Sequence, residues 1–131
     1  FTGLYPGNHG IDQNGRPLAD DVSTLAEVLG GHGFATAAFV SGWTLNRHTQ
    51  LQRGFDVFDD EFSARRRAER TLALALPWLR ERVEAGEPFF LFVHYFDTHI
   101  PYDPPPGAEL RFAGTATPAG WLRPARTRAR R

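Results

Sequence analysis

Residues 89–106, FFLFVHYFDTHIPYDPPP, contain four side chains of the types that catalyse reactions or bind metals: His94, Asp97, His99 and Asp103. Histidine exchanges a proton near neutral pH and can assist the departure of an alkoxide, and a carboxylate can orient the imidazole ring. The same groups also suit zinc or iron, which is a second interpretation. The spacing supports such a metal site weakly, because a strand followed by a proline-rich loop does not hold these side chains on one face.

The element that must position these residues is a strand at 89–95. Its seven residues are apolar except His94. Because the run is short for a helix and too apolar for a half-exposed strand, we expect a strand buried on both faces of a parallel sheet. Ligands of open α/β sheets bind beyond the carboxyl ends of the strands, which is where Asp97 and His99 follow. We interpret His94, on the strand itself, as a core histidine with satisfied hydrogen bonds.

Two helix-then-strand units are predicted along the chain. In the first, Thr24 and Glu27 have the spacing of a capping box, which predicts a helix start before the apolar residues Leu25, Val28 and Leu29. Glycines at 30, 31 and 33 are expected to end this helix before a buried strand at 34–41. The second unit is a helix over 63–84, followed by the strand at 89–95. Its expected apolar stripe consists of Leu72, Leu76, Leu79 and Val83.

The pattern predicts an α/β fold: part of a mostly parallel sheet flanked by helices, and incomplete. Pro77 is expected to kink or divide the second helix. Residues 1–21 and 42–62 are interpreted as loops. His9 and His32 are assigned turn and capping roles, since each lies beside glycine.

Composition excludes some classes of function. All 15 basic residues are arginines and are balanced by 15 acidic residues, which gives no general electrostatic case for a nucleic-acid or membrane partner. There is no cysteine, and no apolar run reaches the ~20 residues of a membrane span. Residues 107–131 are rich in arginine and lack a period, so we expect a disordered tail. Because the chain begins at Phe1 and contains no methionine, we expect it to be a processed product or a piece of a larger protein, and we favour the piece.

Three blocks in one order resemble the sulfatase family of the alkaline phosphatase superfamily. They are TGLYPGNHG (2–10), TLAEVLGGHGFATAAFVSG (24–42) with RGFDVFDD (53–60) behind it, and PFFLFVHYFDTHIPY (88–102). The resemblance covers about residues 1–106 and implies a partial sulfatase-like catalytic domain of the alkaline phosphatase type. Family members are metallohydrolases that cleave sulfate esters, or phosphate esters in related branches, around a divalent cation that is usually calcium.

The resemblance carries one functional position over to this chain. His99, in DTHIPY (97–102), matches the family histidine that reaches the sulfate or its leaving oxygen. Asp97 is a weaker candidate that would orient His99 or a backbone turn. The family's nucleophile, a formylglycine made from Cys or Ser, and its metal carboxylates are expected outside this chain. Alone, the chain is therefore expected to bind no metal and to be inactive. The pairs at 20–21 and 59–60 are not assigned as metal ligands.

The chain departs from the arylsulfatase pattern after the first predicted strand. Where many arylsulfatases have Gly-Lys-Trp-His-Leu, residues 42–45 read GWTL, so the lysine and histidine are missing. His48 lies nearby as a speculative substitute. The substrate is left open among sulfated glycans, sulfolipids and phosphate esters. The alternatives are a phosphate-ester hydrolase or phosphotransferase of the same superfamily, or a truncated product without catalysis. Export to the periplasm or secretion is an expectation from bacterial relatives.

Overall fold

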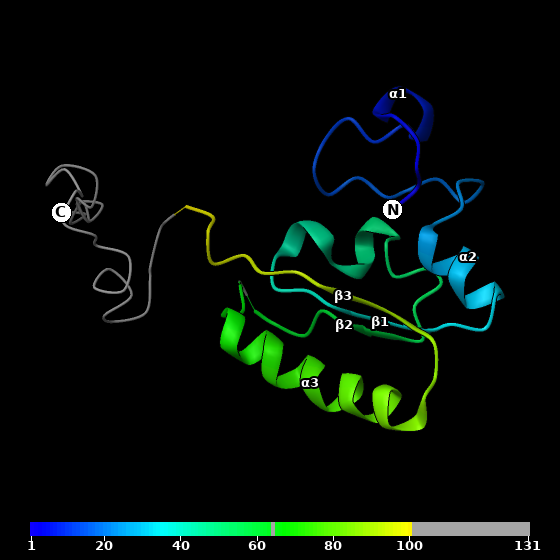
Figure 1. The fold of residues 1–131 in the computed structure, drawn as a ribbon. Helices are drawn as coiled ribbons and strands as arrows, with labels where there is room; N and C mark the ends of the chain where they lie inside the picture. Colours follow the sequence, from blue (N-terminus) through cyan, green and yellow to red (C-terminus); the bar gives the residue numbers. More distant parts are fainter. Residues whose placement is uncertain (64, 101–131) are drawn as a thin grey trace, which may run out of the picture. The chain divides into compact units, whose positions relative to one another are not determined.

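The structure is a computed structural model that describes residues 1–63 and 65–100. The chain divides into two units, Phe1–Phe96 and Asp97–Arg131. The first unit contains all the helices and strands described below, and Figure 1 shows their arrangement. In chain order these elements are α1 (Pro6–His9), α2 (Leu25–Gly31), β1 (Ala35–Phe39), the 3-10 helices η1 (Trp43–Leu45) and η2 (Arg47–Thr49), β2 (Val57–Asp59), α3 (Ala68–Ala85) and β3 (Phe89–Val93).

The three strands form a parallel sheet in the order β2-β1-β3. β1 pairs with β3 from Ala35 opposite Phe89 to Phe39 opposite Val93. α3 lies along one face of the sheet, and α2 with the two 3-10 helices lies on the other (Figure 1). The predicted α/β class and the parallel pairing of the two strands are confirmed.

β3 is apolar along its whole length because each of its faces packs against other side chains. On one face, Leu91 and Val93 join a core of Ala37, Phe39, Ala75 and Trp78. On the other face, Phe90 and Phe92 meet an aromatic cluster, with ring centroids 5.6 Å from Phe55 and 4.6 Å from Phe1 respectively. The prediction of full burial is wrong for this strand, since all five of its residues are partly exposed. Within the described residues, β3 has one neighbouring strand, whereas β1 has two and is the buried strand.

The start of α2 follows the prediction closely. The hydroxyl of Thr24 accepts a hydrogen bond from the backbone of Glu27, and the Glu27 carboxylate accepts one from the backbone of Thr24. The predicted end is wrong by two residues, because Gly30 and Gly31 belong to the helix and His32 caps it. The buried residue of α2 is Ala26, while Leu25 and Val28 of the predicted stripe are exposed.

α3 also packs through a face displaced from the predicted one. Thr71 and Ala75 are buried, and Trp78 packs against the core. Leu72 is 41% exposed and Val83 is 61% exposed. The helix continues through Pro77 without division and ends at Gly86, whose φ of 66° is the left-handed conformation of a helix cap. Small residues on the buried face allow the helix to approach the sheet closely.

The segments expected to be loops contain short regular elements. α1 interrupts residues 1–21, and η1, η2 and β2 lie within 42–62. β2 is three residues long. At its end, the carbonyl oxygen of Asp59 accepts a hydrogen bond from the backbone N–H of Val40, which follows β1. No helix in the described residues is long and apolar enough to span a membrane. The predicted disordered tail at 107–131 lies outside the described residues, as do Tyr102 and Asp103.

Candidate active site

The three strands deliver their following residues to one edge of the sheet, because they are parallel. β1 ends at Phe39 and is followed by the buried residues Val40 and Ser41. β2 ends at Asp59, and β3 ends one residue before His94. This carboxyl edge is where ligands bind in open α/β sheets.

The ends of β1 and β3 are joined by two hydrogen bonds. The backbone N–H of His94 donates to the carbonyl oxygen of Phe39 at 2.9 Å. The hydroxyl of Ser41 donates to the carbonyl oxygen of His94 at 2.5 Å. Gly42 packs against the same place: a Cβ atom there would lie 2.6 Å from the Phe96 ring and 3.2 Å from His94 Cε1. Only glycine fits at this position without displacing these rings.

His94 has the core-like position predicted for it, with one unsatisfied ring atom. Its ring lies between those of Phe92 and Phe96, at centroid distances of 6.4 and 6.1 Å. Nδ1 is buried and has no hydrogen-bond partner among the residues that the structure describes. Burial disfavours the charged form and lowers the pKa of His94 below its usual value. The prediction of a satisfied histidine is wrong, because its aromatic neighbours offer no strong hydrogen-bonding group.

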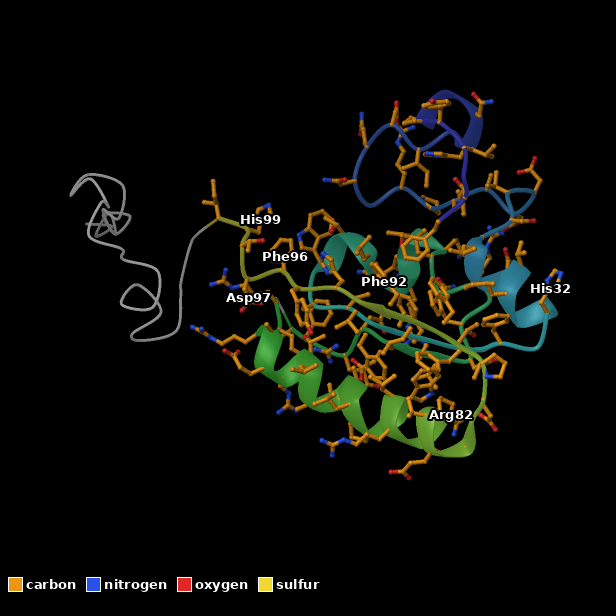
Figure 2. The ribbon with its side chains drawn as sticks, viewed as in Figure 1. His32, Arg82, Phe92, Phe96, Asp97 and His99 are labelled. Atoms are coloured by element: carbon orange, nitrogen blue, oxygen red, sulfur yellow. The ribbon has the colours of Figure 1, made fainter. Side chains whose placement is uncertain are left out.

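Asp97 and His99 lie in the second unit, whose described residues are 97–100. Asp97 begins a turn, and its Oδ2 atom has no hydrogen-bond partner in this described part of the chain. The side chain of His99 is exposed, and its Nδ1 lies 2.8 Å from the carbonyl oxygen of Ile100. Since a carbonyl only accepts, Nδ1 is the donor in this contact. Figure 2 labels both residues.

Arg66 is a buried arginine at the carboxyl edge of the sheet, and the sequence did not identify it as a site residue. The Arg66 side chain is 3% exposed and pairs with the Asp59 carboxylate. It also donates to the carbonyl oxygen of Val40 at 2.7 Å and to the hydroxyl of Thr71 at 3.2 Å. Arg66 therefore ties the ends of β1 and β2 to the first turn of α3. Its run, ARRRAER, is typical of a solvated helix face, and only Asp59 seven residues earlier offers a hint of a buried partner.

The acidic pair at 59–60 binds arginines. Asp60 accepts hydrogen bonds from the guanidinium of Arg47, with its Oδ1 2.7 Å from Nη2. Burial alone would raise the pKa of Asp60, but the hydrogen bonds and positive charge of Arg47 outweigh it and hold that pKa below its usual value. The same hydrogen bonds raise the pKa of Arg47. Both carboxylates of the pair therefore have arginine partners.

The RGFD stretch at 53–56 stabilises the fold. The Arg53 guanidinium donates to the carbonyl oxygen of Asp20 at 3.1 Å and also to that of Val22. The carbonyl oxygen of Arg53 accepts from the Thr24 hydroxyl at 2.9 Å. Asp56 accepts from the backbone N–H of Thr36 at 2.8 Å. The stretch therefore connects the start of α2 to the start of β1 and carries no reacting group.

The described residues do not fit a metal site. In residues 1–63 and 65–100, no three His, Cys, Asp or Glu side chains come together in a way that could hold a metal ion. The zinc or iron interpretation included Asp103, which lies outside the described residues.

The three-stranded parallel sheet, with helices on its two faces, defines an α/β protein. Comparison with family models gives a match to the sulfatase family over residues 1–119. The chain belongs to the sulfatase family, as the resemblance predicted. Enzymes of this family generally bind a divalent metal. No curated protein matches the chain.

A solved structure supports the fold independently. The lipoteichoic acid synthase LtaP from Listeria monocytogenes aligns with a TM-score of 0.54 and 21% sequence identity. The alignment covers 79% of this chain and 26% of that chain, so the present sequence spans about a quarter of its length. At this identity the likeness concerns the fold.

Proposed function

We propose that the chain is a section of the catalytic domain of a sulfate-ester hydrolase. The observation that carries the proposal is the sulfatase-family match over residues 1–119, which includes the histidine block following β3. The described arrangement supports it, because parallel strands β1 and β3 end together at the edge where α/β enzymes bind their ligands. The domain section would extend to about residue 106.

In this proposal, His99 contacts the sulfate or the oxygen that leaves. Its Nδ1 atom lies 2.8 Å from the carbonyl oxygen of Ile100, a contact that favours the tautomer with the proton on Nδ1. Nε2 is then the atom that can take a proton and donate it to the leaving alkoxide. Asp97 acts as a positioning residue for this turn, and its Oδ2 atom has no partner among the described residues.

The remaining chemistry is proposed to come from parts of the protein beyond these 131 residues. Those parts would supply the nucleophile and the carboxylates for a divalent metal, which we propose is calcium. The chain on its own is proposed to bind no metal and to lack activity.

The complete gene product tests this proposal against its alternatives. The full-length protein is assayed with 4-methylumbelliferyl sulfate and 4-methylumbelliferyl phosphate, alongside the 131-residue chain. Preferential cleavage of the sulfate by the full-length protein alone is the expected result. Preference for the phosphate would favour a phosphate-ester hydrolase or phosphotransferase of the same superfamily. No activity from any product encoded at this locus would indicate a truncated, non-catalytic protein.

A further inference from the structure

Asn14 and Gly15 lie in an exposed turn that has no part in the chemistry proposed for His99. The chain contains three asparagines, at positions 8, 14 and 46, and Asn14 is the one that glycine follows. In an asparagine–glycine pair the side-chain amide is open to attack by the next backbone nitrogen, because glycine has no Cβ atom beside that nitrogen. The local structure decides whether such a pair reacts in the folded protein.

Residues 13–16 form a β-turn. The backbone N–H of Arg16 donates to the carbonyl oxygen of Gln13 at 3.4 Å, and Gly15 has a φ of 83°. Asn14 is not among the described non-glycine residues with a positive φ, so its own φ is negative. A negative φ followed by a positive one is the pattern of a type II turn, in which glycine takes the third position.

The turn is weakly held, so the backbone of Asn14 can rotate to bring the two reacting groups together. Its closing hydrogen bond is longer than the usual range of about 2.7–3.2 Å. The ion pair between Asp12 and Arg16 joins two exposed side chains, and such pairs contribute little to stability. The loop is anchored beyond the turn, where the backbone N–H of Leu18 donates to the carbonyl oxygen of Thr49 at 2.9 Å.

The two reacting groups make no hydrogen bond with the residues that the structure describes. This holds for the side-chain amide of Asn14 and for the backbone N–H of Gly15. Both residues are exposed, so water reaches them. Neither the attacking nitrogen nor the leaving amide therefore has to break a bond within the described part of the protein before it reacts.

Asn46 offers a comparison in which both groups are held. Its Oδ1 atom accepts a hydrogen bond from the backbone N–H of His48 at 3.2 Å. The nitrogen that would attack it is that of Arg47, whose backbone N–H donates to Oδ2 of Asp60 at 2.8 Å. Reaction at Asn46 requires these hydrogen bonds to open first.

We propose that Asn14 is a site of spontaneous covalent modification, at which the folded protein converts the asparagine into aspartate and isoaspartate. The backbone nitrogen of Gly15 loses its proton to a solvent base and attacks Cγ of Asn14. The N–Cγ bond forms, the Cγ–Nδ2 bond breaks, and the amide nitrogen takes a proton from water and leaves as ammonia. Water then adds to either carbonyl of the cyclic imide and breaks its bond to nitrogen, which gives one product or the other.

The products change the turn in two ways. Either product places a new carboxylate between Asp12 and Arg16 in the sequence. Isoaspartate also lengthens the backbone by one carbon atom. The longer backbone alters the spacing between the turn and the Trp43 ring, which lies 3.3 Å from the position of a Cβ atom on Gly15. The inference is independent of the proposed function.

The test follows the conversion in the full-length protein at mildly alkaline pH, both folded and in denaturant. A protease that cleaves before aspartate releases residues 12–19, which contain Asn14, and residues 21–55, which contain Asn46. Mass spectrometry measures the fraction of amide converted to acid in each peptide. Cleavage before position 14 identifies aspartate, because the protease does not cleave before isoaspartate.

The rate in denaturant divided by the rate in the folded protein gives the protection of each asparagine by the fold. This ratio cancels the effect of the residue that follows. We expect a ratio within a few-fold of one at Asn14 and of about tenfold or more at Asn46, whose hydrogen bonds must open. The rate at Asn14 should rise with pH, because the attacking nitrogen must lose its proton. Asn14→Gln should abolish the product, because the larger ring that glutamine forms closes more slowly.

Equal protection of Asn14 and Asn46 would overturn the proposal, and so would a rate at Asn14 that does not rise with pH. Acid that still forms in residues 12–19 of the Asn14→Gln variant would also overturn it, because another side chain would then be the source. Sulfate-ester cleavage by the full-length protein is measured separately, so failure of this proposal leaves the proposed function untouched.

Discussion

Ser41 donates a hydrogen bond to the carbonyl oxygen of His94 at 2.5 Å and so fastens the end of β1 to the end of β3. The two residues are 53 positions apart in the sequence. Because Ser41 is fully buried, no solvent can replace this bond.

Replacing Ser41 by alanine is expected to lower the free energy of unfolding by about 1–3 kcal/mol, because the carbonyl oxygen of His94 loses its donor. Chemical denaturation measures the change. Ser63→Ala is the control, since Ser63 is exposed and its hydroxyl makes no hydrogen bond with described residues. Equal stability of the two variants would show that the Ser41 bond is unimportant.

Gly54→Ala is expected to cost about 3 kcal/mol or more. A Cβ atom at Gly54 would lie 2.1 Å from the backbone nitrogen of Glu27, and the φ of 81° is unfavourable for alanine. Gly33→Ala separates the two effects, because Gly33 has a φ of 82° with nothing within 4 Å of the added atom. It should lose only about 1–2 kcal/mol. Similar losses at both glycines would contradict the close approach of residue 54 to α2.

Arg66→Met is expected to destabilise the protein by about 3–5 kcal/mol, because it removes one partner of a buried ion pair and leaves Asp59 uncompensated. Arg16→Met also breaks an arginine–aspartate pair, but both side chains of that pair are exposed, Arg16 at 54% and Asp12 at 65%. That control should lose only about 0–1 kcal/mol. Denaturation midpoints of both variants, compared with the parent chain, distinguish the buried pair from the exposed one. An Arg66 variant as stable as the Arg16 variant would refute the structural role.

The lowered pKa of His94 predicts a pH-dependent contribution to stability. Burial makes the folded protein bind the proton less tightly than the unfolded chain does. The contribution of His94 is therefore complete above the unfolded pKa of about 6.5 and is lost as pH falls toward the folded pKa. His94→Phe should remove this part of the pH dependence between pH ~7.5 and ~5. An NMR titration giving a His94 pKa at or above the usual value would contradict the account.

The sequence predicted elements whose formation depends on local chemistry. The capping box of Thr24 and Glu27 marked the start of α2, and the apolar run at 89–95 marked β3. Helix faces were predicted less well. The hydrophobic pattern predicted that Leu72 and Val83 would be on the buried face of α3, but both are exposed. The helix packs through Thr71 and Ala75, because their small side chains permit close approach to β1.

Site elements that depend on distant partners could not be read from the sequence. The burial of Arg66 depends on three partners that the fold brings together, namely Asp59, Val40 and Thr71. Glycine is needed at position 42 because the rings of His94 and Phe96 lie against it. Neither relation leaves a periodic pattern. Asp97 and His99 follow a strand, as predicted, and their catalytic and positioning roles stay predictions.

The most direct measurement of the central claim is the rate of sulfate-ester cleavage by the full-length protein with His99→Ala. His32→Ala is the control, because the Nδ1 atom of His32 contacts the carbonyl oxygen of Val28 at the end of α2, and that residue has no proposed catalytic role. The account predicts that His99→Ala lowers kcat by about 100- to 10,000-fold and His32→Ala does not. The loss should be larger for alkyl sulfates than for nitrophenyl sulfate, whose leaving group needs less protonation. An unchanged kcat, or the same loss in both variants, would contradict the assignment of His99.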